Sequence, residues 1–167
     1  MLNRPVLLDA FGQFALSTFL CLIAMRLEFL GPLQAVPDEE RDWLRYYLEP
    51  STRWKIWITR FADKNPEAYW SRQYAGQIEL TPPPPDKVGP EYCNTHISTL
   101  VIGHLCAHTF YSHIMSFDGY EGIHLTRIWP PTGHDIDSRA MPTINADSAL
   151  WLHEAFARER KLIRKKV

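Results

Sequence analysis

The stretch from residue 93 to residue 113 constrains the fold of this chain most, because it is long, apolar and rich in histidine. It reads CNTHISTLVIGHLCAHTFYSH and contains four histidines, His96, His104, His108 and His113. Its many β-branched residues, and Gly103 near its centre, favour a strand over a helix. We therefore predict an interior strand over residues 95–111. A central helix over residues 94–115, in a mostly α protein, is the alternative.

Other segments predict an α+β fold in one domain over residues 1–167. A period of two, with Trp54, Ile56 and Ile58 on one side, indicates a strand over 52–62, and further strands are expected over 68–80 and 122–129. These would form an antiparallel sheet of about four strands within residues 52–129. Two helices are expected in residues 1–48, the second beginning at Pro37. A last helix over 145–165 would be capped by Asn145 or Asp147.

Composition limits the classes of partner and the compartment. The net charge of −1 gives no overall positive field, so no nucleic-acid partner is expected. Three cysteines without a CxxC motif indicate reduced thiols, which predicts a cytoplasmic protein.

The first helix carries an unusual pattern. Asp9, Gln13, Ser17 and Cys21 recur every four residues and form a narrow polar stripe on an otherwise apolar helix. Such a helix is expected to be buried against protein over most of its circumference. The uninterrupted apolar run, 14–25, is shorter than the roughly 20 residues that a membrane span needs. A membrane-associated protein anchored by residues 5–30 is the alternative, and a cleaved signal peptide is disfavoured because no small-x-small site follows.

The histidines also allow a metal site. On a helix, His104 and His108 would lie one turn apart and could chelate zinc or iron together, with His96, Asp135 or Asp137 completing the ligands. On a strand they would lie about 13 Å apart, and His104 would be a core histidine held by a single hydrogen bond. The strand interpretation therefore predicts no cofactor.

No motif identifies a catalytic residue, because the chain has no HExxH, no GxSxG and no Walker loop. The leading hypothesis is a non-catalytic binding or assembly protein that acts through protein–protein contacts. Its N-terminal helix would contact a protein partner or a second copy in a homo-oligomer. A metal-dependent, hydrolase-like enzyme using the His104/His108 cluster is the first alternative, and a membrane-associated protein is the second.

Overall fold

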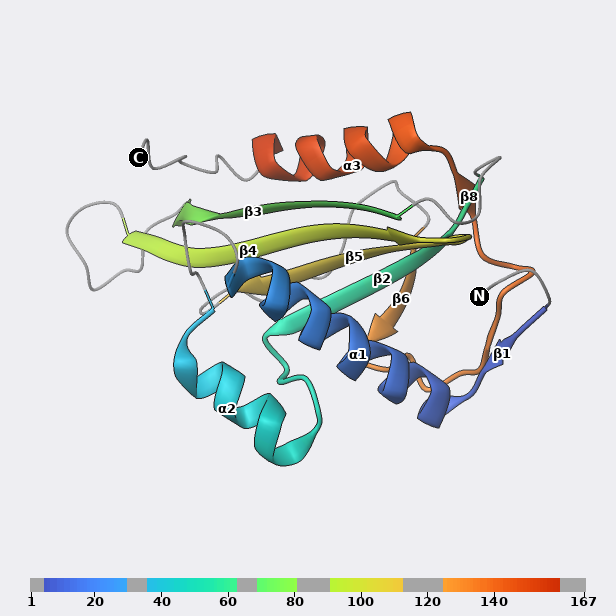
Figure 1. The fold of residues 1–167 in the computed structure, drawn as a ribbon, viewed down its shortest axis with the longest axis horizontal. Helices are drawn as coiled ribbons and strands as arrows, with labels where there is room; N and C mark the ends of the chain where they lie inside the picture. The colour runs from blue at the N-terminus through green and yellow to red at the C-terminus, as the bar shows by residue number, and fades with distance from the viewer. Residues whose placement is uncertain (1–4, 30–35, 63–68, 81–90, 113–124, 160–167) are drawn as a thin grey trace.

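The computed structural model describes residues 5–29, 36–62, 69–80, 91–112 and 125–159. Its elements are β1 (Leu7–Leu8), α1 (Ala10–Phe29), α2 (Asp38–Tyr47), β2 (Trp54–Phe61), β3 (Tyr69–Leu80), β4 (Glu91–Ile102), β5 (Leu105–Ser112), β6 (Thr126–Trp129), β7 (Ile136–Asp137), β8 (Thr143–Ile144) and α3 (Ala146–Glu159). Strands β3-β4-β5-β2-β6 form an antiparallel sheet, and β8 pairs with β2 in parallel. Helix α1 crosses one face and α3 lies on the other (Figure 1). The predicted α+β class is confirmed.

The histidine-rich run is a hairpin and not the single strand predicted over 95–111. Ile102 pairs with Leu105 across a turn formed by Gly103 and His104. Gly103 has φ 57, the first-position geometry of a two-residue hairpin turn that favours glycine. The prediction was wrong because it treated Gly103 only as a weak helix former. The alternative helix over 94–115 is also wrong, because residues 94–112, the part of it that the structure describes, form the two strands and their turn.

Short pairings add strands that the sequence pattern did not indicate. Residues 7–8, expected to be helical, form β1 and pair with β7. Residues 143–144, for which no strand was predicted, form β8 and pair with β2. The strand predicted over 122–129 begins at Thr126, and residues 122–124 lie outside the described residues. Residues 160–165 of the predicted last helix also lie outside them.

The helix starts follow the local signals. The Asn145 side chain accepts a hydrogen bond from the Ser148 amide at 2.8 Å, so Asn145, one of the two predicted caps, is the one that caps α3. Helix α2 follows Pro37 and carries acidic residues in its first turn. Asp9 lies before α1 and accepts a hydrogen bond from the Gly12 amide at 2.7 Å. Asp9, the first residue of the predicted polar stripe, therefore caps α1.

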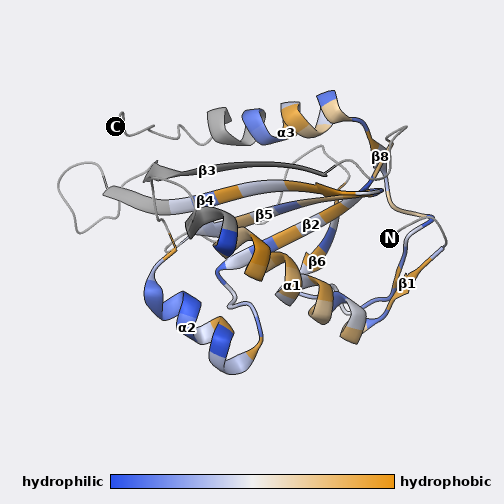
Figure 2. Cartoon of the chain, viewed as in Figure 1, coloured by the Kyte–Doolittle hydropathy of each residue, from blue (hydrophilic) through white to orange (hydrophobic). Residues whose placement is uncertain are grey.

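The core has two parts, one on each face of the sheet. On the α1 face, residues of β2 such as Ile56 and Ile58 pack with Leu20 of α1 and Leu44 of α2. On the opposite face, Phe61, Val101 and Cys106 pack beneath Ala149 of α3. Every residue of β5 is buried. Figure 2 shows hydrophobic colour along β2 and also along α1.

The turn at Gly103 allows a direct test. We expect Gly103→Ala to lower the free energy of unfolding by about 1–2 kcal/mol, because an L side chain disfavours a positive φ. Urea denaturation of the variant and the parent measures this difference. An unchanged unfolding midpoint would show that the turn does not need glycine.

Candidate functional site

The polar stripe of α1 faces into the protein. Gln13, Ser17 and Cys21 are buried. The Gln13 amide nitrogen donates to the carbonyl oxygens of Leu8 at 3.1 Å and His134 at 2.7 Å, and the Ser17 hydroxyl lies 3.5 Å from the carbonyl oxygen of Ile128. Burial, and secondarily the Glu40 carboxylate, raises the pKa of the Cys21 thiol well above its usual value. The stripe therefore binds the backbone of distant segments instead of water.

Apolar side chains consequently occupy the outward side of the same helix. Phe11 is 75% exposed, Phe19 48% and Leu22 45%, and Ala15 between them is exposed as well. The spacing of these four residues places them in one row along α1. We call Phe11, Ala15, Phe19 and Leu22 the outer α1 stripe. A contiguous apolar row of this kind is typical of an interaction surface.

An apolar cavity lies beside this stripe. Its volume is about 380 Å³, and it is lined by Val6, Leu8, Gly12, Ala15, Leu16, Phe19, Ile58 and Leu105. Ala15 and Phe19 belong to both the cavity wall and the outer α1 stripe, so the two features are continuous. Among the residues that the structure describes, no charged side chain lines the cavity. It can accept an apolar group but offers no side chain to orient a polar one.

Helix α2 adds exposed aromatic residues near the other end of α1. Trp43, Tyr46 and Tyr47 are exposed, with ring centroids 4.4 Å apart for Trp43 and Tyr47 and 5.2 Å apart for Tyr46 and Tyr47. The Thr18 hydroxyl donates to the Leu48 carbonyl at 2.9 Å and so joins α1 to the end of α2. Exposed aromatic residues are enriched at protein interfaces.

The sheet separates the histidines that the sequence grouped together. His96 lies on the α1 face, where its ring is 6.4 Å from that of Trp54. His108 lies on the α3 face, and His104 is in the turn, half-buried, with Nδ1 3.3 Å from the Phe61 carbonyl oxygen. The single hydrogen bond predicted for His104 is present, but its full burial is not. His113 lies outside the described residues.

The remaining proposed metal ligands lie on other elements than the hairpin. Asp137 belongs to β7 and forms an ion pair with Arg139, which lowers the pKa of the Asp137 carboxyl. Asp135 precedes it in an exposed loop. Among the residues that the structure describes, no three His, Cys, Asp or Glu side chains come close enough to hold a metal ion.

A buried polar network under α3 is the feature that the sequence did not reveal. The Thr99 hydroxyl lies 3.0 Å from Nδ1 of His108 and 2.9 Å from Nδ1 of His153 on α3. One hydroxyl proton serves only one of these bonds, so at least one imidazole carries its proton on Nδ1. Nε2 of His108 lies 3.5 Å from the Cys106 sulfur. This network ties α3 to β4 and β5.

The network has the wrong electrostatics for a cysteine nucleophile. Burial raises the pKa of the Cys106 thiol to about 12, although the Thr59 hydroxyl acts in the opposite direction. Burial also lowers the pKa of His108 to about 4, so both groups are neutral near pH 7. A reactive cysteine needs a lowered pKa and access to substrate. We interpret the network as structural.

Comparison with protein families, curated proteins and solved structures finds no match to this chain. The outer α1 stripe and its neighbouring cavity are therefore interpreted from geometry alone.

The burial of His108 predicts loss of stability in acid. Its pKa falls from 6.5 to about 4 on folding, so between these values the unfolded chain binds a proton that the folded chain does not. The free energy of unfolding should decrease as pH falls through this range, by about 3 kcal/mol in all. His108→Gln should remove this part of the pH dependence. Urea denaturation across the range measures it.

His104→Gln is the matched control, because His104 is half-buried in the hairpin turn. His104→Gln keeps His108, so the acid dependence that His108→Gln removes should persist in it. Burial, and secondarily the charge of Arg41, lowers the pKa of His96 to about 3. This contribution to the acid dependence is the same in the parent chain and in both variants. An identical acid dependence of the parent and His108→Gln would contradict the assignment.

Proposed function

We propose that this chain is a non-catalytic binding or assembly protein that acts through protein–protein contacts made by the outer α1 stripe. The observation that carries the proposal is the orientation of α1, which buries Gln13 and Ser17 and exposes Phe11, Phe19 and Leu22. Single exposed apolar residues are common in folded proteins, but a continuous row is not. Covering this row with protein would contribute a favourable free energy of about 25 cal/mol for each Å² of apolar area removed from water.

The neighbouring features support an interface rather than a catalytic site. The apolar cavity beside Ala15 and Phe19 can take an anchoring side chain from a partner. The exposed aromatic residues of α2 extend the apolar surface beyond the stripe.

A second copy of the chain fits the stripe well. If two α1 helices pack antiparallel about a two-fold axis, Phe11 of one copy faces Leu22 of the other. The axis then passes close to Ala15, whose small side chain lets the helices approach closely. The net charge of −1 leaves little repulsion between copies. We therefore propose self-association as the form of assembly.

The assembly proposal predicts the effect of two exposed substitutions. The full chain should elute as a dimer or larger, and Phe11→Gln with Leu22→Gln should convert it to a monomer with an unchanged circular dichroism spectrum. Light scattering after size exclusion measures the mass. Trp151→Gln is the control, because Trp151 is equally exposed but lies on α3, away from the stripe. A parent chain that is monomeric at all concentrations would refute self-association.

Membrane association through residues 5–30 would use the same stripe. Among the described residues, no helix is long and apolar enough to cross a membrane. The proposal therefore places the stripe against protein and keeps the expectation of a cytoplasmic location, which the buried, unpaired thiols of Cys21 and Cys106 support. Flotation of the chain with lipid vesicles, abolished by Phe11→Gln with Leu22→Gln, would favour the membrane alternative.

The metal-dependent enzyme stays as the other alternative, and metal analysis of the purified chain tests it. We expect no stoichiometric metal that depends on His104, since no three His, Cys, Asp or Glu side chains of the described residues come together around a metal. About one equivalent of zinc or iron, lost in His104→Ala, would instead favour the enzyme.

A further inference from the structure

A second pocket lies between α1 and α2, at the end of the outer α1 stripe. Its volume is about 260 Å³. Three arginines and three apolar residues line it: Leu22, Met25, Arg26, Arg41, Leu44 and Arg45. Leu22 also belongs to the outer α1 stripe, but the assembly proposal gives no role to the three arginines.

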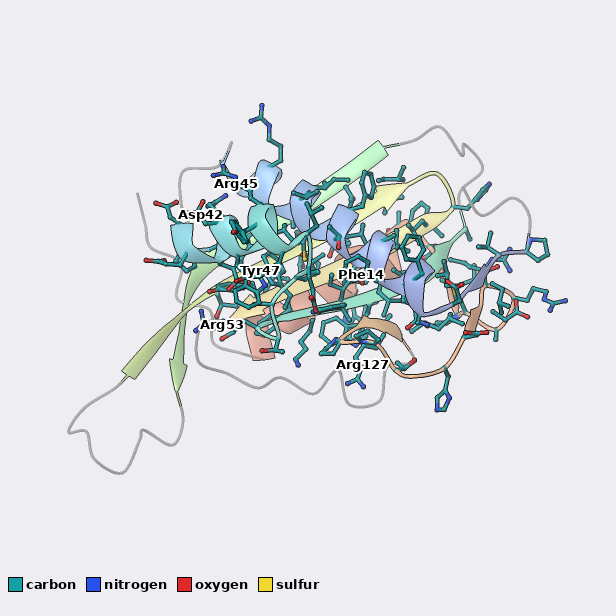
Figure 3. All side chains as sticks on the ribbon, turned by 90° about the horizontal axis from the view of Figure 1, so that it is seen from below. Phe14, Asp42, Arg45, Tyr47, Arg53 and Arg127 are labelled. Atoms are coloured by element: carbon teal, nitrogen blue, oxygen red, sulfur yellow. The ribbon has the colours of Figure 1, made fainter. Side chains whose placement is uncertain are left out.

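The arginines are partly fixed in place. Arg41 has a side chain only 11% exposed; its Nη1 donates to the Met25 carbonyl at 3.4 Å, and its Nε lies 3.9 Å from the Asp38 carboxylate. Arg45 pairs with Asp42 at 3.2 Å on the exposed side of α2, and Figure 3 shows these two side chains together there. No hydrogen bond or ion pair from Arg26 to another described residue is found.

Two carboxylates of α2 pair with arginines of the pocket. Asp38 faces Arg41, and Asp42 faces Arg45. Glu40 is buried and turned away, with its carboxylate 3.2 Å from Nε1 of Trp54 and 3.7 Å from Nη1 of Arg53.

We infer that this pocket binds an organic carboxylate, with the carboxylate between the guanidinium groups and an apolar stem against Leu22, Met25 and Leu44. Guanidinium groups bind carboxylates through paired, charge-assisted hydrogen bonds. The apolar wall would stay wet beneath a bare inorganic anion but is covered by an alkyl stem. The small volume limits the stem to a short chain. The carboxylate belongs either to a free acid or to an acidic side chain of another protein.

The inference does not rest on the proposed function: Leu22 belongs to both surfaces, but the three arginines that would hold the carboxylate are not part of the outer α1 stripe. The probe is hexanoate, added to the full chain and followed by ¹H–¹⁵N NMR, which detects weak binding and reports its location. Shifts should concentrate at residues 22–26 and 41–45. Hexanol and inorganic phosphate are the matched probes, each lacking one half of the ligand. Each should bind about tenfold more weakly than hexanoate, the effect of losing about 1.4 kcal/mol.

Variants assign the binding to the arginines. Arg26→Gln and Arg45→Gln are exposed changes on helix surfaces, and each should weaken hexanoate binding about tenfold while hexanol is unaffected. Arg60→Gln, an exposed arginine of β2 outside the pocket, is the charge-matched control and should have no effect. The peptide acetyl-Leu-Glu-Leu-amide, whose only charge is a side-chain carboxylate, tests the second source of the ligand.

Each outcome decides the inference. Selective binding of hexanoate or of the peptide, weakened by either pocket variant, supports it, and the tighter of the two identifies the source. Phosphate binding as tight as that of hexanoate would overturn the role of the apolar wall. Absence of shifts at these residues with both carboxylate probes, or equal binding by Arg26→Gln and the parent, would overturn the site. A monomeric parent chain that still binds hexanoate would refute only self-association.

Discussion

The sheet must be covered on both faces, and the rest of the structure depends on this requirement. Every residue of β5 is buried, so apolar and polar side chains alike are withdrawn from water on both sides. Helix α3 covers one side, where Thr99 and His153 bond beneath it. Helix α1 covers the other, and there it also meets carbonyl groups of neighbouring loops and of β6. A buried carbonyl without a donor is costly, so the side of α1 that faces inward has to carry donors.

This requirement explains why Gln13 and Ser17 of α1 face the interior, although the polar side chains of a surface helix usually face solvent. The Gln13 amide satisfies the Leu8 and His134 carbonyls, the second of them 121 residues away in sequence. Because Gln13 and Ser17 are used inside, the outward side of this part of the helix carries Phe11, Phe19 and Leu22. The sequence revealed the narrow polar stripe, but local periodicity assigns polar residues to solvent by default. Only the distant acceptors determine that this stripe points inward.

Elements that depend on neighbouring residues in the sequence were predicted better than contacts between residues far apart in the sequence. The alternation of Trp54, Ile56 and Ile58 predicted β2, and the cap at Asn145 predicted the start of α3, because both depend on neighbours in sequence. The turn at Gly103 was missed because a single glycine among β-branched residues suits a strand as well as a hairpin. The meeting of His153 with Thr99, 54 residues apart, leaves no local pattern. The sequence therefore predicted the helix that carries the outer α1 stripe, but it did not predict that this side of the helix is exposed.

The two ends of α1 differ in a way that bears on what each can bind. Its C-terminal end carries the negative end of the helix dipole, and Arg41 donates to the Met25 carbonyl there. That dipole offsets part of the positive charge of the arginine pocket, so a bare anion gains less there than it would at a helix N-terminus. Binding then has to draw on apolar contact with Leu22, Met25 and Leu44 as well as on charge. An anion with an apolar stem meets both demands, whereas a hydrophilic anion meets only one.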